Sequence, residues 1–184
     1  MGYSPNQVQR AAHKAFLIDD HKLGLLFWGR RTGKTLWSMQ QIIWSSMLNQ
    51  GQHFIVFKEY QQAETVAWNQ YLHHIPKQII KGQPNKSTLI VDFQYFTGKV
   101  KFPWCKGSCK VIEGALTHVS DCDCIELIPD YSKPPSSLRF LGSDKSDSHR
   151  GNEAVGMIFD EYQDQDPDPW FEVYSKFFAT TSDK

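Results

Sequence analysis

The stretch that decides the fold is residues 25–35, which read Leu25-Leu26-Phe27-Trp28-Gly29-Arg30-Arg31-Thr32-Gly33-Lys34-Thr35. An apolar run breaks there into a turn rich in glycine and arginine, and a helix-compatible segment follows to about residue 50. A strand, a tight loop and a helix N-terminus in this order form a cradle for phosphate, because the loop N–H groups and the helix dipole place positive charge at one spot. The stretch therefore predicts a phosphate-binding loop.

Three residues of this loop have predicted roles. Gly33 lets the backbone approach the phosphates, Lys34 reaches the β and γ oxygens, and the Thr35 hydroxyl holds Mg²⁺. The usual pattern, G-x-x-x-x-G-K-[ST], would place its first glycine at position 28, but this chain has Trp28 there and Gly29 one step later. An ordinary turn that happens to read Gly-Lys-Thr is the alternative. The apolar run before the loop and the helix after it favour the phosphate loop.

Length and charge limit the classes of protein to consider. The chain has 184 residues, so we expect a single domain with an irregular excursion at about 103–135. Lys plus Arg and Asp plus Glu both number 20, so bulk charge does not indicate a nucleic-acid partner. The N-terminus lacks the layout of a signal peptide, and no apolar run is long enough to span a bilayer. We therefore expect a soluble, intracellular protein.

Hydrophobic periodicity predicts alternating helices and strands. Apolar residues at helical spacing predict helices over 3–17, 34–50 and 61–73, and Asp168-Pro169 is typical of another helix start. Apolar runs predict strands at 23–28, 54–57, 138–141 and 155–159, and a strand–turn–strand unit over 86–102. This alternation predicts an α/β layer fold around a mostly parallel central sheet.

The strand at 155–159 ends in two carboxylates, Asp160 and Glu161. Beside a phosphate loop, Asp160 would bind Mg²⁺ through its water shell, and Glu161 could orient the attacking water as general base. Acidic pairs at strand ends are more often solvated or capping groups, but the phosphate loop reverses that preference. A guanidinium can stabilise charge on the γ-phosphate, and the candidates are Arg30, Arg31 and Arg150, whose alternative is a surface ion pair.

Together these features resemble the ATPase domain of the large terminase subunit, the motor that packages DNA into phage and herpesvirus capsids. The resemblance rests on residues 28–35, 147–151 (Asp-Ser-His-Arg-Gly), 158–162 (Ile-Phe-Asp-Glu-Tyr) and 59–68. The family often replaces the first loop glycine and places arginine inside the loop, as this chain does. The resemblance covers residues 3–102 and 137–182. It implies a three-layer P-loop fold of the RecA-like ASCE class, and we expect the family's C-terminal nuclease to be absent.

The resemblance also implies roles outside the loop. Tyr3-x-Pro5-x-Gln7 looks like the adenine-reading motif, with Gln7 hydrogen-bonding the base edge. Arg30 matches a loop arginine that is a candidate sensor or finger in cis. Arg150 matches an arginine proposed to reach the nucleotide of a neighbouring subunit. The triplet Thr180-Thr181-Ser182 looks like the motif that couples hydrolysis to movement.

The four cysteines all fall within the irregular excursion. They are Cys105, Cys109, Cys122 and Cys124. Four thiolates could bind Zn²⁺ tetrahedrally, but C-x3-C followed by C-x-C is not a standard zinc spacing. Independent thiols are the favoured interpretation, and the intracellular expectation disfavours disulfides.

We therefore expect an ATPase that uses ATP and Mg²⁺ to drive double-stranded DNA into a procapsid. The resemblance implies partners (a portal protein and a small terminase subunit), a homo-oligomeric ring when assembled, a monomer in isolation, and a place in the host cytoplasm. Two alternatives stay open, namely a helicase-class ATPase that separates strands and an assembly switch that binds ATP without productive turnover. The expected catalytic residues are Lys34, Arg30, Arg150 and Glu161, the nucleotide contacts are Tyr3, Gln7 and residues 29–35, and the magnesium ligands are Thr35 and Asp160.

Overall fold

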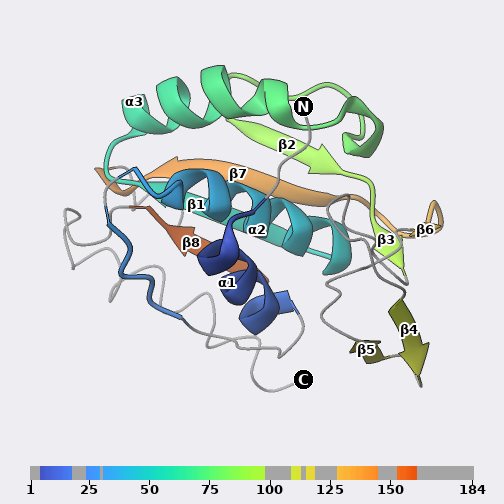
Figure 1. Cartoon of the computed structure of the whole chain (residues 1–184). Helices are drawn as coiled ribbons and strands as arrows, with labels where there is room; N and C mark the ends of the chain where they lie inside the picture. The colour runs from blue at the N-terminus through green and yellow to red at the C-terminus, as the bar shows by residue number, and fades with distance from the viewer. Residues whose placement is uncertain are drawn as a thin grey trace.

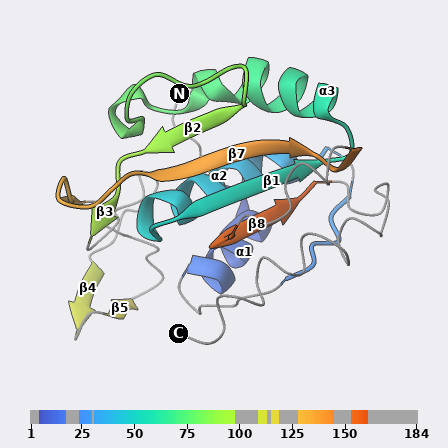
Figure 2. The same cartoon turned by 180° about the vertical axis from the view of Figure 1, so that it is seen from behind.

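The computed structural model describes residues 5–17, 24–29, 31–97, 109–112, 115–118, 128–144 and 153–160, and they fold as an α/β unit (Figure 1). The main sheet has four strands in the order β2-β7-β1-β8. Helix α2 lies across one face of this sheet, and helix α1 lies beside α2 (Figures 1 and 2). No helix within the described residues has both the length and the apolar character needed to cross a bilayer.

Three strands of the main sheet run parallel. Strand β1 (Gln52–Phe57) is central and pairs in parallel with β7 (Ser136–Gly142) on one side and β8 (Gly156–Phe159) on the other. Strand β2 (Ile90–Phe93) pairs antiparallel with β7. Every residue of β1 after Gln52 is buried, which explains its continuous apolar run. The predicted mixed α/β fold with a mostly parallel sheet is confirmed.

Helix α2 (Lys34–Leu48) begins directly after the phosphate loop and covers the sheet. Met39, Ile43 and Met47 recur at intervals of four residues and are buried on one face of the helix. They join a core formed by inward side chains of β1, β2 and β7: Ile55, Phe57, Val91, Phe93, Leu138 and Phe140. The helix ends before Gly51, whose φ of 136° is readily adopted only by glycine. The helix predicted over 34–50 is therefore confirmed.

Helix α1 (Gln7–Leu17) packs on α2 through aromatic side chains. The ring of Trp37 lies 5.5 Å from that of His13 and 5.9 Å from that of Phe16. Nδ1 of His13 forms a 2.9 Å hydrogen bond with Oε1 of Gln41. Burial lowers the pKa of His13 to about 4, so this histidine is neutral at physiological pH. The α1–α2 contact therefore consists of neutral, largely apolar surface.

The segment after β1 is helical, as predicted for 61–73, but its pitch changes along its length. It begins as α3 (Tyr60–Gln62), continues as the π-helix η1 (Ala63–Tyr71) and ends as the 3-10 turn η2 (Leu72–His74). A second 3-10 turn, η3 (Lys77–Ile79), follows Pro76. Trp68 of η1 meets the ring of Phe140 edge-on at 6.4 Å, which attaches this helix to the same face of the sheet as α2.

Of the strand–turn–strand unit predicted over 86–102, the first strand is found, and the second, at 99–102, lies outside the described residues. Residues 90–93 do form β2, but they pair with β7, which follows some 40 residues later in the chain. Strand β3 (Phe96–Thr97) pairs with β6 (Ile128–Pro129). Alternation of apolar residues predicts a strand but does not indicate which strand lies beside it. The strand beside β2 is β7, most of whose residues are buried. Within the segment 103–135, where an irregular excursion is expected, the described residues include β6 and the antiparallel pair β4 (Cys109–Ile112) and β5 (Ala115–His118).

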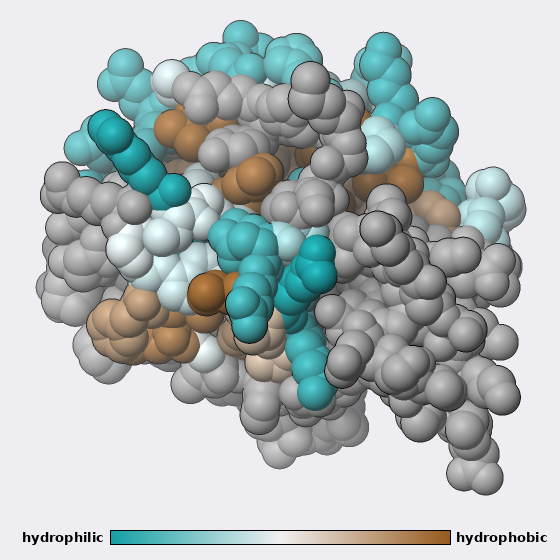
Figure 3. All heavy atoms as spheres, in the orientation of Figure 1, coloured by the Kyte–Doolittle hydropathy of each residue, from teal (hydrophilic) through white to brown (hydrophobic). Residues whose placement is uncertain are grey.

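The strand predicted at 23–28 is also absent from its described part. Residues 24–29 carry no regular secondary structure and pair with no described strand. Two of their apolar side chains face outward, with Leu25 69% and Phe27 87% exposed, whereas Trp28 is half-buried and its ring lies 5.6 Å from that of Trp37. Figure 3 shows hydrophobic atoms at the lower left of the face where Figure 1 draws this segment. A strand needs a hydrogen-bonding neighbour, and the described residues provide none here.

Side chains at both ends of β7 fix its alignment with β1. At the start, the hydroxyl of Ser136 donates to the carbonyl of Asn49 at 3.0 Å and accepts from the N–H of Gly51 at 3.3 Å. At the end, the hydroxyl of Ser143 donates to the carbonyl of Lys58 at 2.8 Å. Ser136 and Ser143 therefore hold the two chain segments that enter and leave β1.

Candidate functional site: the phosphate loop

The described part of the phosphate loop, residue 29 and residues 31–35, passes through two left-handed backbone positions. Gly33 has φ 78° and ψ 32° and immediately precedes the first turn of α2. Arg31 is the other, with φ 60°. The hydroxyl of Thr32 donates to the carbonyl of Gly29 at 2.8 Å and closes the turn. Positive φ strains residues other than glycine, so the backbone conformation at position 33 explains why the sequence pattern has glycine there.

The helix that follows is built to receive an anion. The first hydrogen bond of α2 runs from the N–H of Trp37 to the carbonyl of Gly33 at 2.9 Å. The N–H groups of Lys34, Thr35 and Leu36 precede it, and such groups have no acceptor within their own helix. Together with the helix dipole they favour phosphate at this end of α2.

The loop and the acidic strand end meet directly. The hydroxyl of Thr35 donates to Oδ2 of Asp160 at 3.0 Å, across 125 positions of sequence. The N–H of Asp160 donates to the carbonyl of Val56, which continues the β1–β8 ladder and fixes the backbone that carries the carboxylate. The two oxygen atoms predicted as Mg²⁺ ligands therefore lie side by side, and both are of the hard oxygen type that this ion prefers.

Several predicted site residues lie outside the described part of the chain. They are Tyr3, Arg30, Arg150, Glu161, Thr180, Thr181, Ser182, Cys105, Cys122 and Cys124. Of the cysteines, only the backbone of Cys109 is described, in β4. Among the described residues, no group of three or more His, Cys, Asp or Glu side chains is placed to hold a metal.

The side chain of α1 that reaches the phosphate loop is Gln9, which the sequence analysis did not single out. Gln7, predicted to read adenine, is exposed at the start of α1. Gln9 is 5% exposed, and its Nε2 donates to the carbonyls of Thr32 at 3.3 Å and Gly33 at 3.2 Å. The signal that could have found it is Asn6-x-x-Gln9, a helix-capping spacing with glutamine in the third helical position.

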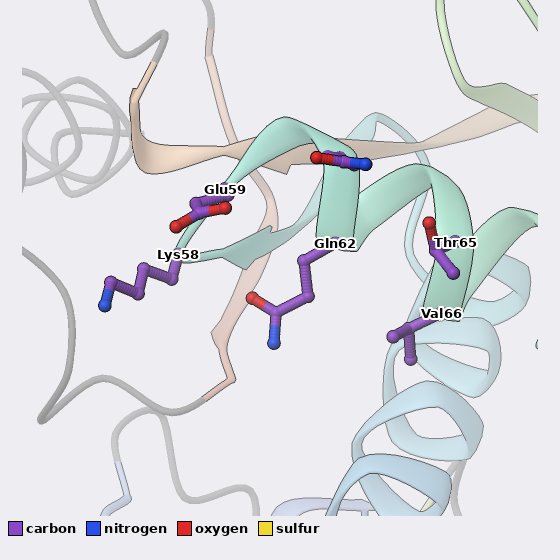
Figure 4. A pocket seen from close by; sticks show the side chains of 6 residues that line it. Lys58, Glu59, Gln62, Thr65 and Val66 are labelled. Atoms are coloured by element: carbon purple, nitrogen blue, oxygen red, sulfur yellow. The ribbon is translucent and has the colours of Figure 1, made fainter.

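A separate hollow of about 410 Å³ lies where β1 runs into α3. Figure 4 shows Lys58 at the end of β1, with Gln62 and Thr65 extending from the helix that follows. Its lining is Lys58, Glu59, Gln61, Gln62, Thr65 and Val66. It contains none of the predicted site residues, so it is distinct from the contact between Thr35 and Asp160.

The architecture places the chain in a class of mixed α/β proteins, with a mostly parallel sheet and a tight loop that leads into α2 at the carboxyl end of its strands. No protein-family model matches the chain, and no curated protein matches it. Two solved structures do. Both are the large terminase ATPase domain of Thermus phage P74-26, one of them an arginine-to-alanine mutant, with TM-scores of 0.66 and 0.61.

Both matches are at 17% identity and cover 97% of this chain. The chain therefore has the RecA-like fold of a phage large terminase ATPase domain. It spans 62% of the length of each matched chain. At this identity the likeness establishes the fold, and the ligand and activity have to be argued from the site.

Proposed function

We propose that this chain is the ATP-hydrolysing motor domain of a phage terminase large subunit. The observation that carries the proposal is the 3.0 Å contact between the Thr35 hydroxyl and Asp160. It joins the start of α2 to the end of β8, the two places where a P-loop ATPase needs its magnesium ligands. The terminase fold of the matched structures supports the same assignment.

The proposed roles follow from position in the site. Lys34 is the first residue of α2, from which an ammonium can reach β and γ oxygens. Thr35 and Asp160 would hold Mg²⁺, which when bound neutralises charge on the triphosphate. Glu161 follows Asp160 directly and is proposed as the general base that orients water. Arg30 and Arg150 are proposed to stabilise charge on the γ-phosphate.

The wider setting is part of the same proposal. We propose that hydrolysis drives translocation of double-stranded DNA, that the working form is a homo-oligomeric ring, and that its partners are a portal protein and a small terminase subunit. Tyr3 and Gln7 are proposed to read adenine, and the triplet at 180–182 to couple hydrolysis to movement. Assembly would take place in the host cytoplasm.

The first experiment measures MgATP affinity by calorimetry for the wild-type chain, Lys34→Ala and Lys81→Ala. Lys81 is an exposed lysine of similar chemistry outside the phosphate loop and serves as the matched control. We expect Lys34→Ala to lose binding by about a hundredfold or more, because it removes a charge-assisted contact to phosphate. Wild-type affinity in Lys34→Ala, or no affinity in the wild-type chain, would remove the proposal.

The second experiment separates the proposed motor from its alternatives. We expect Glu161→Gln to bind MgATP and not to turn it over, and we expect double-stranded DNA to stimulate turnover of the wild-type chain. Strand separation of a duplex would instead indicate a helicase-class ATPase. ATP binding with no hydrolysis by the wild-type chain, with or without DNA, would indicate an assembly switch.

A further inference from the structure

Gln9 links two elements that the proposed function treats separately, the adenine-reading end of α1 and the phosphate loop. Its carboxamide is buried, with 5% of the residue exposed. It lies against the outer side of the loop, where Nε2 is within 3.3 Å of the Thr32 carbonyl and 3.2 Å of the Gly33 carbonyl. A buried amide that donates to two loop carbonyls restricts how those peptide units can rotate.

The orientation of this carboxamide is set by its other partner. Oε1 of Gln9 accepts from the N–H of Asn6 at 2.9 Å, and the Asn6 side chain accepts from the N–H of Gln9 at the same distance. This reciprocal pair is a capping box in which Gln9 occupies the third helical position. Because the oxygen is used by the cap, the amide nitrogen is the atom that faces the loop.

The loop in turn is shaped around this amide. A Cβ added to Gly33 would lie 2.9 Å from Nε2 of Gln9, so the amide at the end of the Gln9 side chain would have to shift away from the loop. The positive φ of Gly33 already favours glycine, and the amide adds a steric reason. The Thr32 carbonyl accepts from Gln9, and the Gly33 carbonyl accepts both from Gln9 and from the N–H of Trp37, so Gln9 adds a second hold on the peptide that opens α2 and leaves the loop N–H groups for a phosphate.

We propose that Gln9 is a positioning residue for polyphosphate binding. Its amide holds the Thr32 and Gly33 carbonyls on the outer side of the loop, which keeps the loop in its phosphate-binding conformation. It also ties α1, which begins with the proposed adenine contact Gln7, to that conformation. This inference rests on the proposed function, because it assumes that the loop binds a nucleotide triphosphate.

The test variant is Gln9→Glu. A glutamate at this position can still accept from the Asn6 N–H, so the helix cap remains, but its carboxylate cannot donate to the loop carbonyls and is repelled by them. Two controls accompany it. Asn6→Ala weakens the cap and leaves the amide–loop contact, and Gln78→Leu changes an exposed glutamine of η3.

The measured quantity is the dissociation constant for two ligands, MgATP and magnesium tripolyphosphate, in the full 184-residue chain. We expect Gln9→Glu to weaken both by about tenfold near pH 7.5, with the two controls within about twofold of wild type. Burial raises the pKa of a carboxyl, so lowering the pH toward about 5 should protonate part of the introduced glutamate and restore a donor, and the ratio of the variant's dissociation constant to that of the wild type should then fall. A variant that is only less stable would not show this return.

Each contrary outcome has a distinct meaning. Wild-type affinity in Gln9→Glu, while Lys34→Ala has lost binding, overturns the positioning role and leaves the proposed function standing. Weaker MgATP with unchanged tripolyphosphate affinity also overturns it, because Gln9 would then act on the base. No binding of either ligand by the wild-type chain overturns the proposed function itself.

Discussion

The segments on either side of the phosphate loop, residues 24–29 before it and α2 after it, both carry apolar side chains but differ in how far these are buried. Downstream, α2 buries Trp37, Met39 and Ile43 against α1 and the sheet. Upstream, the segment 24–29 has no strand partner among the described residues and exposes Leu25 and Phe27. An apolar run gains stability only where a second surface removes it from water, so the difference lies in the neighbour rather than in the run.

The largest effect expected on the downstream flank comes from emptying the core below α2. Phe140 is fully buried and meets Trp68 edge-on. We expect Phe140→Ala to lower the free energy of unfolding by about 3–5 kcal/mol, because it removes apolar burial and leaves a cavity. Denaturant unfolding measures this loss. A loss below about 1 kcal/mol would mean that the core below α2 is packed no better than the segment 24–29.

A smaller effect on the same flank depends on pH. Burial holds the pKa of His13 at about 4, below its ordinary value of 6.5, so the unfolded chain binds the proton first as pH falls. The stability that neutral His13 contributes is complete above pH 6.5 and is lost between pH 6.5 and 4.

We therefore expect the drop in unfolding free energy from about pH 7 to about pH 5 to be about 2 kcal/mol smaller in His13→Asn than in the wild-type chain. Burial lowers the pKa of His53 to about 4 as well, so the wild-type drop contains a second contribution that this variant retains. Equal drops in the two proteins would show that His13 is not buried in solution.

Gly33 lies between these two segments, and a substitution there tests how much its positive φ contributes to stability. Gly33→Ala places a methyl group at φ 78° and against Gln9. We expect a loss of about 1–2 kcal/mol in unfolding free energy. A matched Gly82→Ala, also at positive φ but with open space around it, should lose less, because only the backbone term remains. An equal loss of unfolding free energy in the two variants would show that contact with Gln9 adds no steric cost at position 33.

The smallest effect is expected upstream. Phe27 is 87% exposed, so Phe27→Ser should change the unfolding free energy by less than about 0.5 kcal/mol. Thermal unfolding of the two proteins side by side measures this. A loss above about 1 kcal/mol would break the comparison, since it would mean that the upstream run is also covered in solution.

The fold was predictable from sequence wherever local pattern and burial agree. The strands at β1, β7 and β8 and the helix α2 lie where the apolar runs and the period of α2 place them. The sequence pattern does not give what depends on a distant neighbour. The strand predicted at 23–28 is absent from residues 24–29, which pair with no described strand, and the pattern around residues 90–93 does not indicate that β7 is the partner of β2.

The site was predictable where chemistry fixes the residue type. Gly33 and Thr35 follow from the phosphate-loop pattern, and Asp160 follows from its place at the end of an apolar strand. Thr35 and Asp160, both predicted as magnesium ligands, are in hydrogen-bond contact, whereas their binding of Mg²⁺ and the roles of Lys34, Glu161 and the arginines stay predictions. Gln9 was overlooked because its contacts are to backbone atoms 23 and 24 positions away, which no residue pattern encodes.

The two serines that hold β7 against β1 have a consequence for how this protein can change over time. Ser136 and Ser143 are seven positions apart, and their hydroxyls donate to carbonyls on either side of β1, those of Asn49 and Lys58. Inserting or deleting one residue within either strand would move at least one of the two hydroxyls away from its carbonyl and would turn the inward side chains on one side of the change outward. Length variation among descendants of this chain should therefore accumulate in the connections and leave these two strands at constant length.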